Sequence, residues 1–274
     1  MELFKEWFEL TSEWEPVFAQ SRTCERATQM SLGMLCGLGR RTLTRALTFL
    51  GQEQQDWGAN YKLFSRSPWD PQELFVPVWE KGLEYFGPKT KMIPVAVDDT
   101  SLKRRGKKVP GAGWMRDAMG PPFHTNLIWG QRFIQASLLL PLYRADRQAS
   151  ARALPVRFME APLVKPPGRK ASDEALAEYK QQKKEQNLSK KFVQLAEELR
   201  EQLDQLGQAD HILGLFGDGS YCNRTVFRAN REGVEVTCRA RKDLRLCFPA
   251  QEKRRVYGTE KFTPLEIYED KKRK

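Results

Sequence analysis

The chain has 274 residues, enough for one large domain or for a small domain beside a larger one. Its 46 Lys and Arg residues outnumber 35 Asp and Glu, and the formal net charge of +11 favours a polyanionic partner, most simply nucleic acid. No apolar run approaches the roughly 18 residues of a membrane span, and the start MELFKEWFEL lacks the order of a signal peptide. The alternative is a basic protein without a polyanionic partner.

The cysteine pattern argues against zinc and against a disulfide framework. The five cysteines form no CxxC pair and their number is odd, which fits a reducing cytosol. His124 and His211 are too few for a histidine-based metal site.

Residues 1–88 are predicted to be a small all-helical region. Within it, residues 26–50 read as a helix, a tight turn at Gly37-Leu38-Gly39 and a second helix opened by Arg40-Arg41-Thr42. This is the order of a helix-turn-helix, in which the second helix lies in the DNA major groove. Arg40, Arg41 and Arg45 would then contact DNA. The alternative is an ordinary helical hairpin with a solvated arginine-rich face.

A strand that ends in two carboxylates follows, at residues 91–102 (KMIPVAVDDTSL). The β-branched run predicts a buried strand, and Asp98 and Asp99 stand at its end. Adjacent carboxylates there are costly unless compensated, and a divalent cation would compensate them. The alternative is a strand-end turn, which Asp, Thr and Ser also favour.

The next segment, KRRGKK, is a basic loop that suits a phosphate backbone brought to metal ions, or is simply a solvated charge run. Its candidate DNA contacts are Lys103, Arg104, Arg105, Lys107 and Lys108.

The remaining elements are expected in the order strand, strand, long helix, strand, helix, strand. Their residue ranges are 126–142, 153–158, 173–206, 211–216, 223–230 and 234–241. The strand at 211–216 again runs into a carboxylate, Asp218, flanked by two glycines. Arg239 and Arg241 of the last strand would hold phosphates or lie on a solvated face.

This order predicts an α/β domain over residues 89–274 with an RNase H-like mixed five-stranded sheet. In such folds the first and fourth strands are neighbours, so Asp98 and Asp218 would meet over one site. Two such carboxylates can share a pair of Mg²⁺ ions about 3.5–4 Å apart, which activate the attacking oxygen and stabilise the leaving oxygen on phosphorus.

The sequence resembles the DDE transposases of bacterial insertion sequences. The matching pieces are VAVDDTSL at 95–102, GDGSY at 217–221 and VTCRARKDLRL at 236–246. The resemblance implies an RNase H-like catalytic domain, Mg²⁺ or Mn²⁺, and cleavage and joining at element ends. By this match Asp98 is the first catalytic acid, with Asp99 as the alternative, and Asp218 is the second.

The resemblance also implies DNA partners, both element ends and target, and a dimer or larger assembly, in a bacterial cytoplasm at the nucleoid. Water would first cut a strand, and the freed 3′-hydroxyl would then attack target DNA.

The third acid of the family, a glutamate from a helix after the fifth strand, is where this sequence departs. Glu260, Glu266 and Glu269 follow that strand, but residues 259–274 lack an apolar helical face and Pro264 interrupts them. We therefore expect that none of these glutamates is catalytic and that the chain is truncated before the last helix of the family. We also expect that it cleaves DNA weakly or not at all. The alternative function is a non-catalytic DNA-binding fragment that occupies element ends.

Overall fold

The computed structural model divides the chain into two compact units, Met1–Tyr85 and Phe86–Lys274. Each unit is described by itself. The residues that the structure describes are 2–87, 89–117, 119–121, 123–142, 150–229, 231–251 and 257–270. Among them, no helix has both the length and the apolar character to cross a membrane.

The first unit is built from helices, as its apolar spacing predicts. Its elements are α1 (Glu2–Ser12), the 3₁₀ turn η1 (Glu15–Val17), α2 (Ser21–Cys36), α3 (Leu43–Phe49), α4 (Gly58–Ser65), η2 (Glu73–Phe75) and α5 (Val76–Leu83). Two small cores hold it together. One gathers around Phe18, Cys24 and Leu63, and the other joins α2 to α3.

Helices α2 and α3 cross closely, with Met30 packed against Ala46 and Leu47. A Cβ at Gly33 would lie 2.8 Å from the carbonyl oxygen of Ala46, so glycine permits this approach. The prediction that Arg40 and Arg41 open the second helix is wrong. The helix begins at Leu43, because the Thr42 hydroxyl accepts the Arg45 N–H as its N-cap.

The second unit is a mixed sheet with helices. Its elements are β1 (Met92–Lys103), β2 (Gly113–Arg116), β3 (Leu127–Leu142), β4 (Ser150–Glu160), α6 (Asp173–Glu185), α7 (Leu188–Gln205), β5 (Ile212–Gly217), α8 (Arg224–Arg228), β6 (Val234–Cys238), β7 (Leu246–Pro249), β8 (Tyr257–Phe262) and α9 (Pro264–Glu269). The main sheet has the order β2-β3-β1-β5-β6, and β4 also pairs with β3.

The mixed α/β architecture is the one predicted for this unit, but the sheet has six strands rather than five. The additional strand, β2, has only four residues and pairs antiparallel with the first part of β3. A separate two-stranded sheet, β7-β8, lies outside the main sheet.

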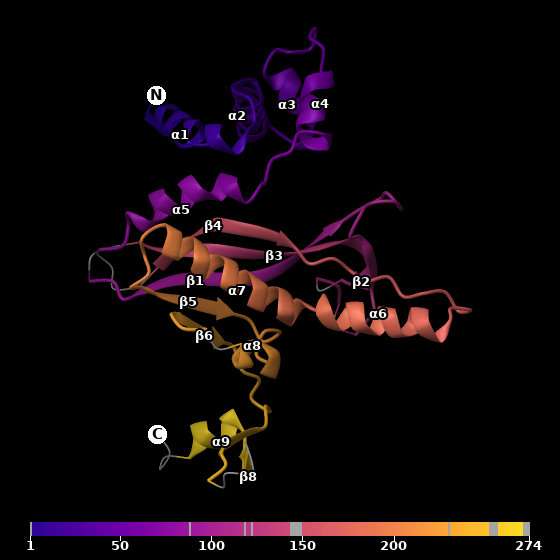
Figure 1. Cartoon of the computed structure of the whole chain (residues 1–274), viewed down its shortest axis with the longest axis vertical. Helices are drawn as coiled ribbons and strands as arrows, with labels where there is room; N and C mark the ends of the chain where they lie inside the picture. Colours follow the sequence, from indigo (N-terminus) through magenta and orange to yellow (C-terminus); the bar gives the residue numbers. More distant parts are fainter. Residues whose placement is uncertain are drawn as a thin grey trace. The chain divides into compact units, whose positions relative to one another are not determined.

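Helix α7 covers one face of the sheet (Figure 1). Arg157 of β4 stands opposite Ala136, which stands opposite Val97, so the three share a face. The Arg157 guanidinium reaches Glu198 of α7 at 3.1 Å. The core therefore lies between α7 and the alternate residues of β1, β3 and β5. Its fully buried members include Val95, Val97, Ile134, Leu138, Leu195, Leu199, Leu213 and Leu215.

The predicted single helix over 173–206 is two helices, broken at Gln186-Asn187. Asn187 caps α7 by accepting the Lys190 N–H at 2.9 Å. Helix α6 buries no residue, whereas α7 buries seven, so only α7 contributes to the core.

Candidate functional site

Two carboxylates lie at neighbouring positions of two adjacent parallel strands. The prediction that the first strand ends in Asp98 and Asp99 is wrong, because β1 keeps its pairing with β3 and continues to Lys103. β1 pairs parallel with β5, and Val97 stands opposite Gly217, so Asp98 comes next within β1 and Asp218 is the first residue after β5. The Asp98 carboxylate accepts the Asp99 N–H at 2.9 Å. The Asp218 carboxylate accepts the N–H of Ser220 at 2.9 Å and its hydroxyl as well.

Asp99 is a third carboxylate in this cluster. By strand alternation it shares the covered face with Val97, and it is half-buried, whereas Asp98 is exposed. Burial raises the pKa of Asp99, and the charges of Asp98 and Asp218 raise it further, while Arg132 acts in the opposite direction. The charges of Asp98 and Asp218 therefore both act on Asp99. We call Asp98, Asp99 and Asp218 the acidic cluster.

Arg132 lies beside this cluster because of the antiparallel register. It stands opposite Ser101 on β3, two residues past Asp99 and on the same face. Its positive charge offsets part of the cluster's negative charge. Sequence reasoning missed Arg132, because its place depends on the register of β1 against β3, which no local pattern encodes.

Tyr221 forms the floor of the loop after β5. It is fully buried, and its ring lies 4.7 Å from that of Phe192 of α7, centroid to centroid. A Cβ at Gly217 would come within 3.0 Å of the Tyr221 ring, so glycine makes room for it. Burial first, and then the charges of the acidic cluster, raise the pKa of Tyr221.

Tyr221 therefore stays protonated at physiological pH. Its hydroxyl has no hydrogen-bond partner among the described residues. The GDGSY motif contains this tyrosine, but no local pattern predicts that its ring packs against Phe192 of α7.

The acidic cluster consists of carboxylates, the donors that magnesium and manganese ions prefer. In the described part of the chain, no group of three or more His, Cys, Asp or Glu side chains is arranged to hold a metal ion. Mg²⁺ is nevertheless often held by one or two carboxylates together with water and substrate phosphates. The hard oxygen donors and the excess negative charge felt by Asp99 fit such an ion.

The basic segment begins with Lys103, the last residue of β1, and continues into the loop that follows it. Its five predicted DNA-binding residues are all exposed. Two of them have partners: Lys103 pairs with Asp117 at 3.1 Å, and Arg104 donates to the Gln131 side chain at 2.7 Å. Gly106 accepts the Trp129 indole N–H at 3.0 Å, which fixes the middle of the loop.

The other predicted DNA contacts are also exposed but differ in their surroundings. Arg40 and Arg41 lie in the turn before α3, and Arg45 lies on α3. The prediction that Arg239 and Arg241 belong to the fifth strand is wrong, because β6 ends at Cys238. Arg241 forms an ion pair with Asp243 at 2.7 Å.

The C-terminal glutamates occupy a strand and a short helix. The prediction that Pro264 interrupts any helix is wrong: α9 begins at Pro264, where its fixed φ and missing N–H are tolerated. Glu266 belongs to a capping box, accepting the Thr263 N–H at 2.7 Å. Glu266 thus has a structural role in α9, and the charges that act on Asp99 come from Arg132, Asp98 and Asp218.

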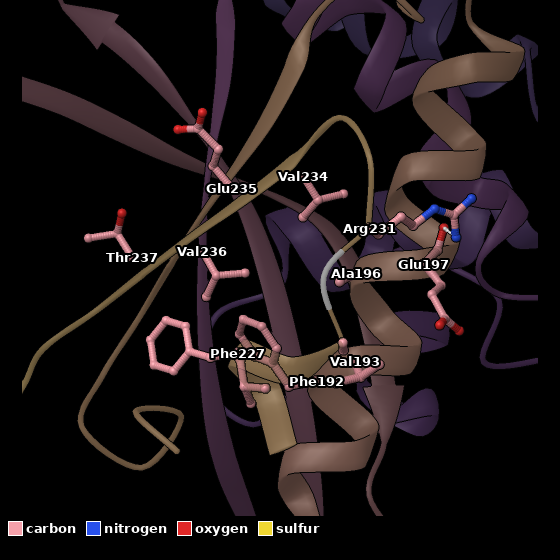
Figure 2. A pocket seen from close by; sticks show the side chains of 12 residues that line it. Phe192, Val193, Ala196, Glu197, Phe227, Arg231, Val234, Glu235, Val236 and Thr237 are labelled. Atoms are coloured by element: carbon pink, nitrogen blue, oxygen red, sulfur yellow. Dashed lines mark hydrogen bonds between the residues drawn. The ribbon is translucent and has the colours of Figure 1, made fainter. Parts of the chain in front are cut away.

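A different pocket, of about 340 Å³, lies between α7, α8 and β6 (Figure 2). Its walls are largely apolar, including Phe192, Val226 and Val236. The Arg231 guanidinium donates to the Glu197 carbonyl oxygen at 3.3 Å there. None of the acidic cluster lines this pocket, and its character does not suit metal ions or phosphate.

Comparison with known families agrees with this geometry. Residues 15–261, most of the chain, match the family model described as DDE superfamily endonuclease. The chain therefore belongs to the DDE superfamily endonucleases, a class of nucleases and transposases that act on DNA. Searches of curated proteins and of solved structures found no match.

Proposed function

We propose that this chain is a transposase that cuts and joins DNA strands by metal-dependent phosphoryl transfer at the ends of an insertion sequence. The observation that supports the proposal is the acidic cluster: Asp98 on β1 and Asp218, directly after the adjacent parallel strand β5, both add negative charge at Asp99. Family membership supplies DNA as the substrate.

The reaction would proceed by two displacements at phosphorus. Water attacks a phosphodiester, the bond from phosphorus to the 3′ oxygen breaks, and a 3′-hydroxyl and a 5′-phosphate result. The 3′-hydroxyl then attacks a phosphodiester of target DNA, the bond from that phosphorus to its 3′ oxygen breaks, and the target strand is left with a 3′-hydroxyl that takes up the proton. Bound Mg²⁺ or Mn²⁺ would supply Lewis-acid activation of these oxygens.

The chain's own residues would bind and orient the participants. Asp98 and Asp218 would hold the metal, with Asp99 as the alternative to Asp98. Lys107 and Lys108 would hold backbone phosphates, and the arginines at the start of α3 would contact an element end. Since no third acid completes a metal-holding group among the described residues, we expect slow cleavage.

The test is nicking of supercoiled plasmid by the purified chain in Mg²⁺, Mn²⁺ or EDTA. We expect weak nicking in either metal, none in EDTA, and a loss of at least about tenfold in Asp218→Asn, since ligand carboxylates are needed for metal binding. Asp243→Asn is the matched control, because Asp243 is an exposed aspartate that pairs with Arg241 away from the cluster. Equal nicking by the two variants would refute the assignment.

A second candidate is a DNA-binding protein without catalysis, acting by occupying element ends. The lack of a three-ligand metal group among the described residues favours it. It predicts salt-dependent DNA binding that is the same with and without metal, and no nicking under any condition.

A further inference from the structure

A basic and aromatic groove opens at the edge of the sheet that carries β2. Its volume is about 650 Å³, within the usual range for ligand pockets. β2 and β3 contribute Trp114 and Trp129, α6 contributes Tyr179, and the segment after β4 closes one side. We call this site the aromatic groove.

The aromatic rings of the groove are available for stacking. Trp114 is 68% exposed, which is costly for so large an apolar side chain. Its ring lies 5.8 Å from that of Trp129, centroid to centroid, at an interplanar angle of 66°. The exposed Trp114 ring is therefore the one available to another planar group.

The groove carries positive charge and no acidic side chain. Lys165 lies over the Trp129 ring at 5.5 Å, and Lys183 lies 5.7 Å from the Tyr179 ring. Within the described residues neither lysine pairs with a carboxylate. Arg132 also lines the groove, and its Nε is buried without a hydrogen-bond partner in the same part of the chain. Planar rings beside unpaired cations suit a ligand that is both flat and anionic.

Hydrogen bonds within the chain hold the walls of the groove in place. The acceptors are backbone carbonyl oxygens: that of Gly106 accepts the Trp129 indole N–H, that of Arg132 accepts the Ala161 N–H at 2.8 Å, and that of Gly111 accepts the Leu163 N–H at 3.2 Å. A Cβ at Gly113 would come within 2.9 Å of Leu163, so glycine lets this segment lie against β2. A preformed site of this kind loses little conformational entropy on binding.

We infer that the aromatic groove binds unpaired bases of a DNA strand next to the phosphate that is cut. Ring faces of bases are covered by their neighbours in a duplex, so stacking on Trp114 selects single-stranded DNA. Arg132 links the groove to the acidic cluster, since it lines the groove and its charge also acts on Asp99. The position beside a cut phosphate rests on the proposed function, but the binding of bases does not.

The test measures binding of fluorescein-labelled oligothymidine and of a blunt duplex to the full chain in EDTA. Trp114→Ala should weaken oligothymidine binding about tenfold, within the range for loss of one stacked base, and leave duplex binding unchanged. Trp114→Phe should restore most of the affinity, because phenylalanine still stacks. The control is Phe227→Ala, which removes another half-exposed aromatic, in the pocket of Figure 2.

A second pair of variants tests the charge. Lys183→Ala should weaken oligothymidine binding more than Lys184→Ala, which removes the next lysine of α6 but does not line the groove. Equal losses for single strand and duplex in Trp114→Ala, or no loss in either, would overturn the inference.

The two proposals fail separately. If the chain does not nick DNA but its binding of single strands depends on Trp114, the catalytic proposal fails and the groove proposal stands. If the chain nicks DNA in the presence of metal but its binding of single strands does not depend on Trp114, the groove proposal fails and the catalytic proposal stands.

Discussion

At the residue scale, the charge state of Asp99 gives the acidic cluster a measurable signature. Because burial raises the pKa of Asp99 above its ordinary 3.8, the folded chain holds this proton more tightly than the unfolded chain. Stability therefore falls as the pH rises above 3.8 and through the folded-state pKa. Asp99→Asn removes this cost, so in EDTA it should raise the free energy of unfolding at neutral pH and have little effect in acid. Urea unfolding at a series of pH values measures the difference.

Asp117→Asn is the control with the opposite sign. A hydrogen bond from Lys103 lowers the pKa of Asp117. The ionised Asp117 therefore stabilises the fold above pH 3.8, and this contribution to the free energy of unfolding is lost as the pH falls through the folded-state pKa. This variant should be slightly less stable than the parent at neutral pH and equal to it in acid. A shift of the same sign in both variants would contradict the raised pKa of Asp99.

The residues of the site were predictable to different degrees. Asp98 and Asp218 could be predicted from the sequence because each follows a buried apolar run, and adjacent parallel strands bring such positions together. Their roles as metal ligands remain a prediction. Arg132 and Tyr221 could not be predicted from the sequence. The place of Arg132 follows from strand register, and that of Tyr221 from the close packing of its ring against Gly217.

At the scale of elements, the break between α6 and α7 shows the limit of periodicity. No glycine or proline separates the two helices, so the spacing of leucines predicted one helix. The signal was present in Asn187, a good N-cap residue placed directly before the apolar stripe begins at Leu188. The four residues of β2 carried no such signal, because a strand that short has no period to detect.

The cap of α7 should matter more than the cap of α6. Asn187→Ala removes the acceptor for the Lys190 N–H and should cost about 1 kcal/mol of global stability. Ser172→Ala removes the equivalent bond to Ala175, but α6 buries no residue, so its fraying should leave the sheet intact. Urea midpoints compare the two, and equal losses would show that α6 belongs to the same cooperative unit.

At the scale of the whole molecule, the net charge of +11 predicted a nucleic-acid partner, and family membership agrees with it. Composition does not say which of the 46 cations contact DNA. Arg40, Arg41 and Arg45 are exposed around one turn, and among the described residues none of them forms an ion pair. Three unpaired cations beside a helix start are the geometry expected for phosphate contacts.

The triple variant of Arg40, Arg41 and Arg45 to alanine should weaken duplex binding and flatten its salt dependence. Each phosphate contact contributes about 0.9 to the slope of log K against log salt, so the slope should fall by about 3. Fluorescence anisotropy of a labelled duplex at several KCl concentrations gives both slopes. The matched control changes three other exposed or half-exposed cations of the same unit, Arg22, Lys62 and Arg66. It removes the same charge, so an equal fall in slope would mean that the turn has no special contact with DNA. A larger fall in the first triple would place the phosphate backbone at the turn between α2 and α3.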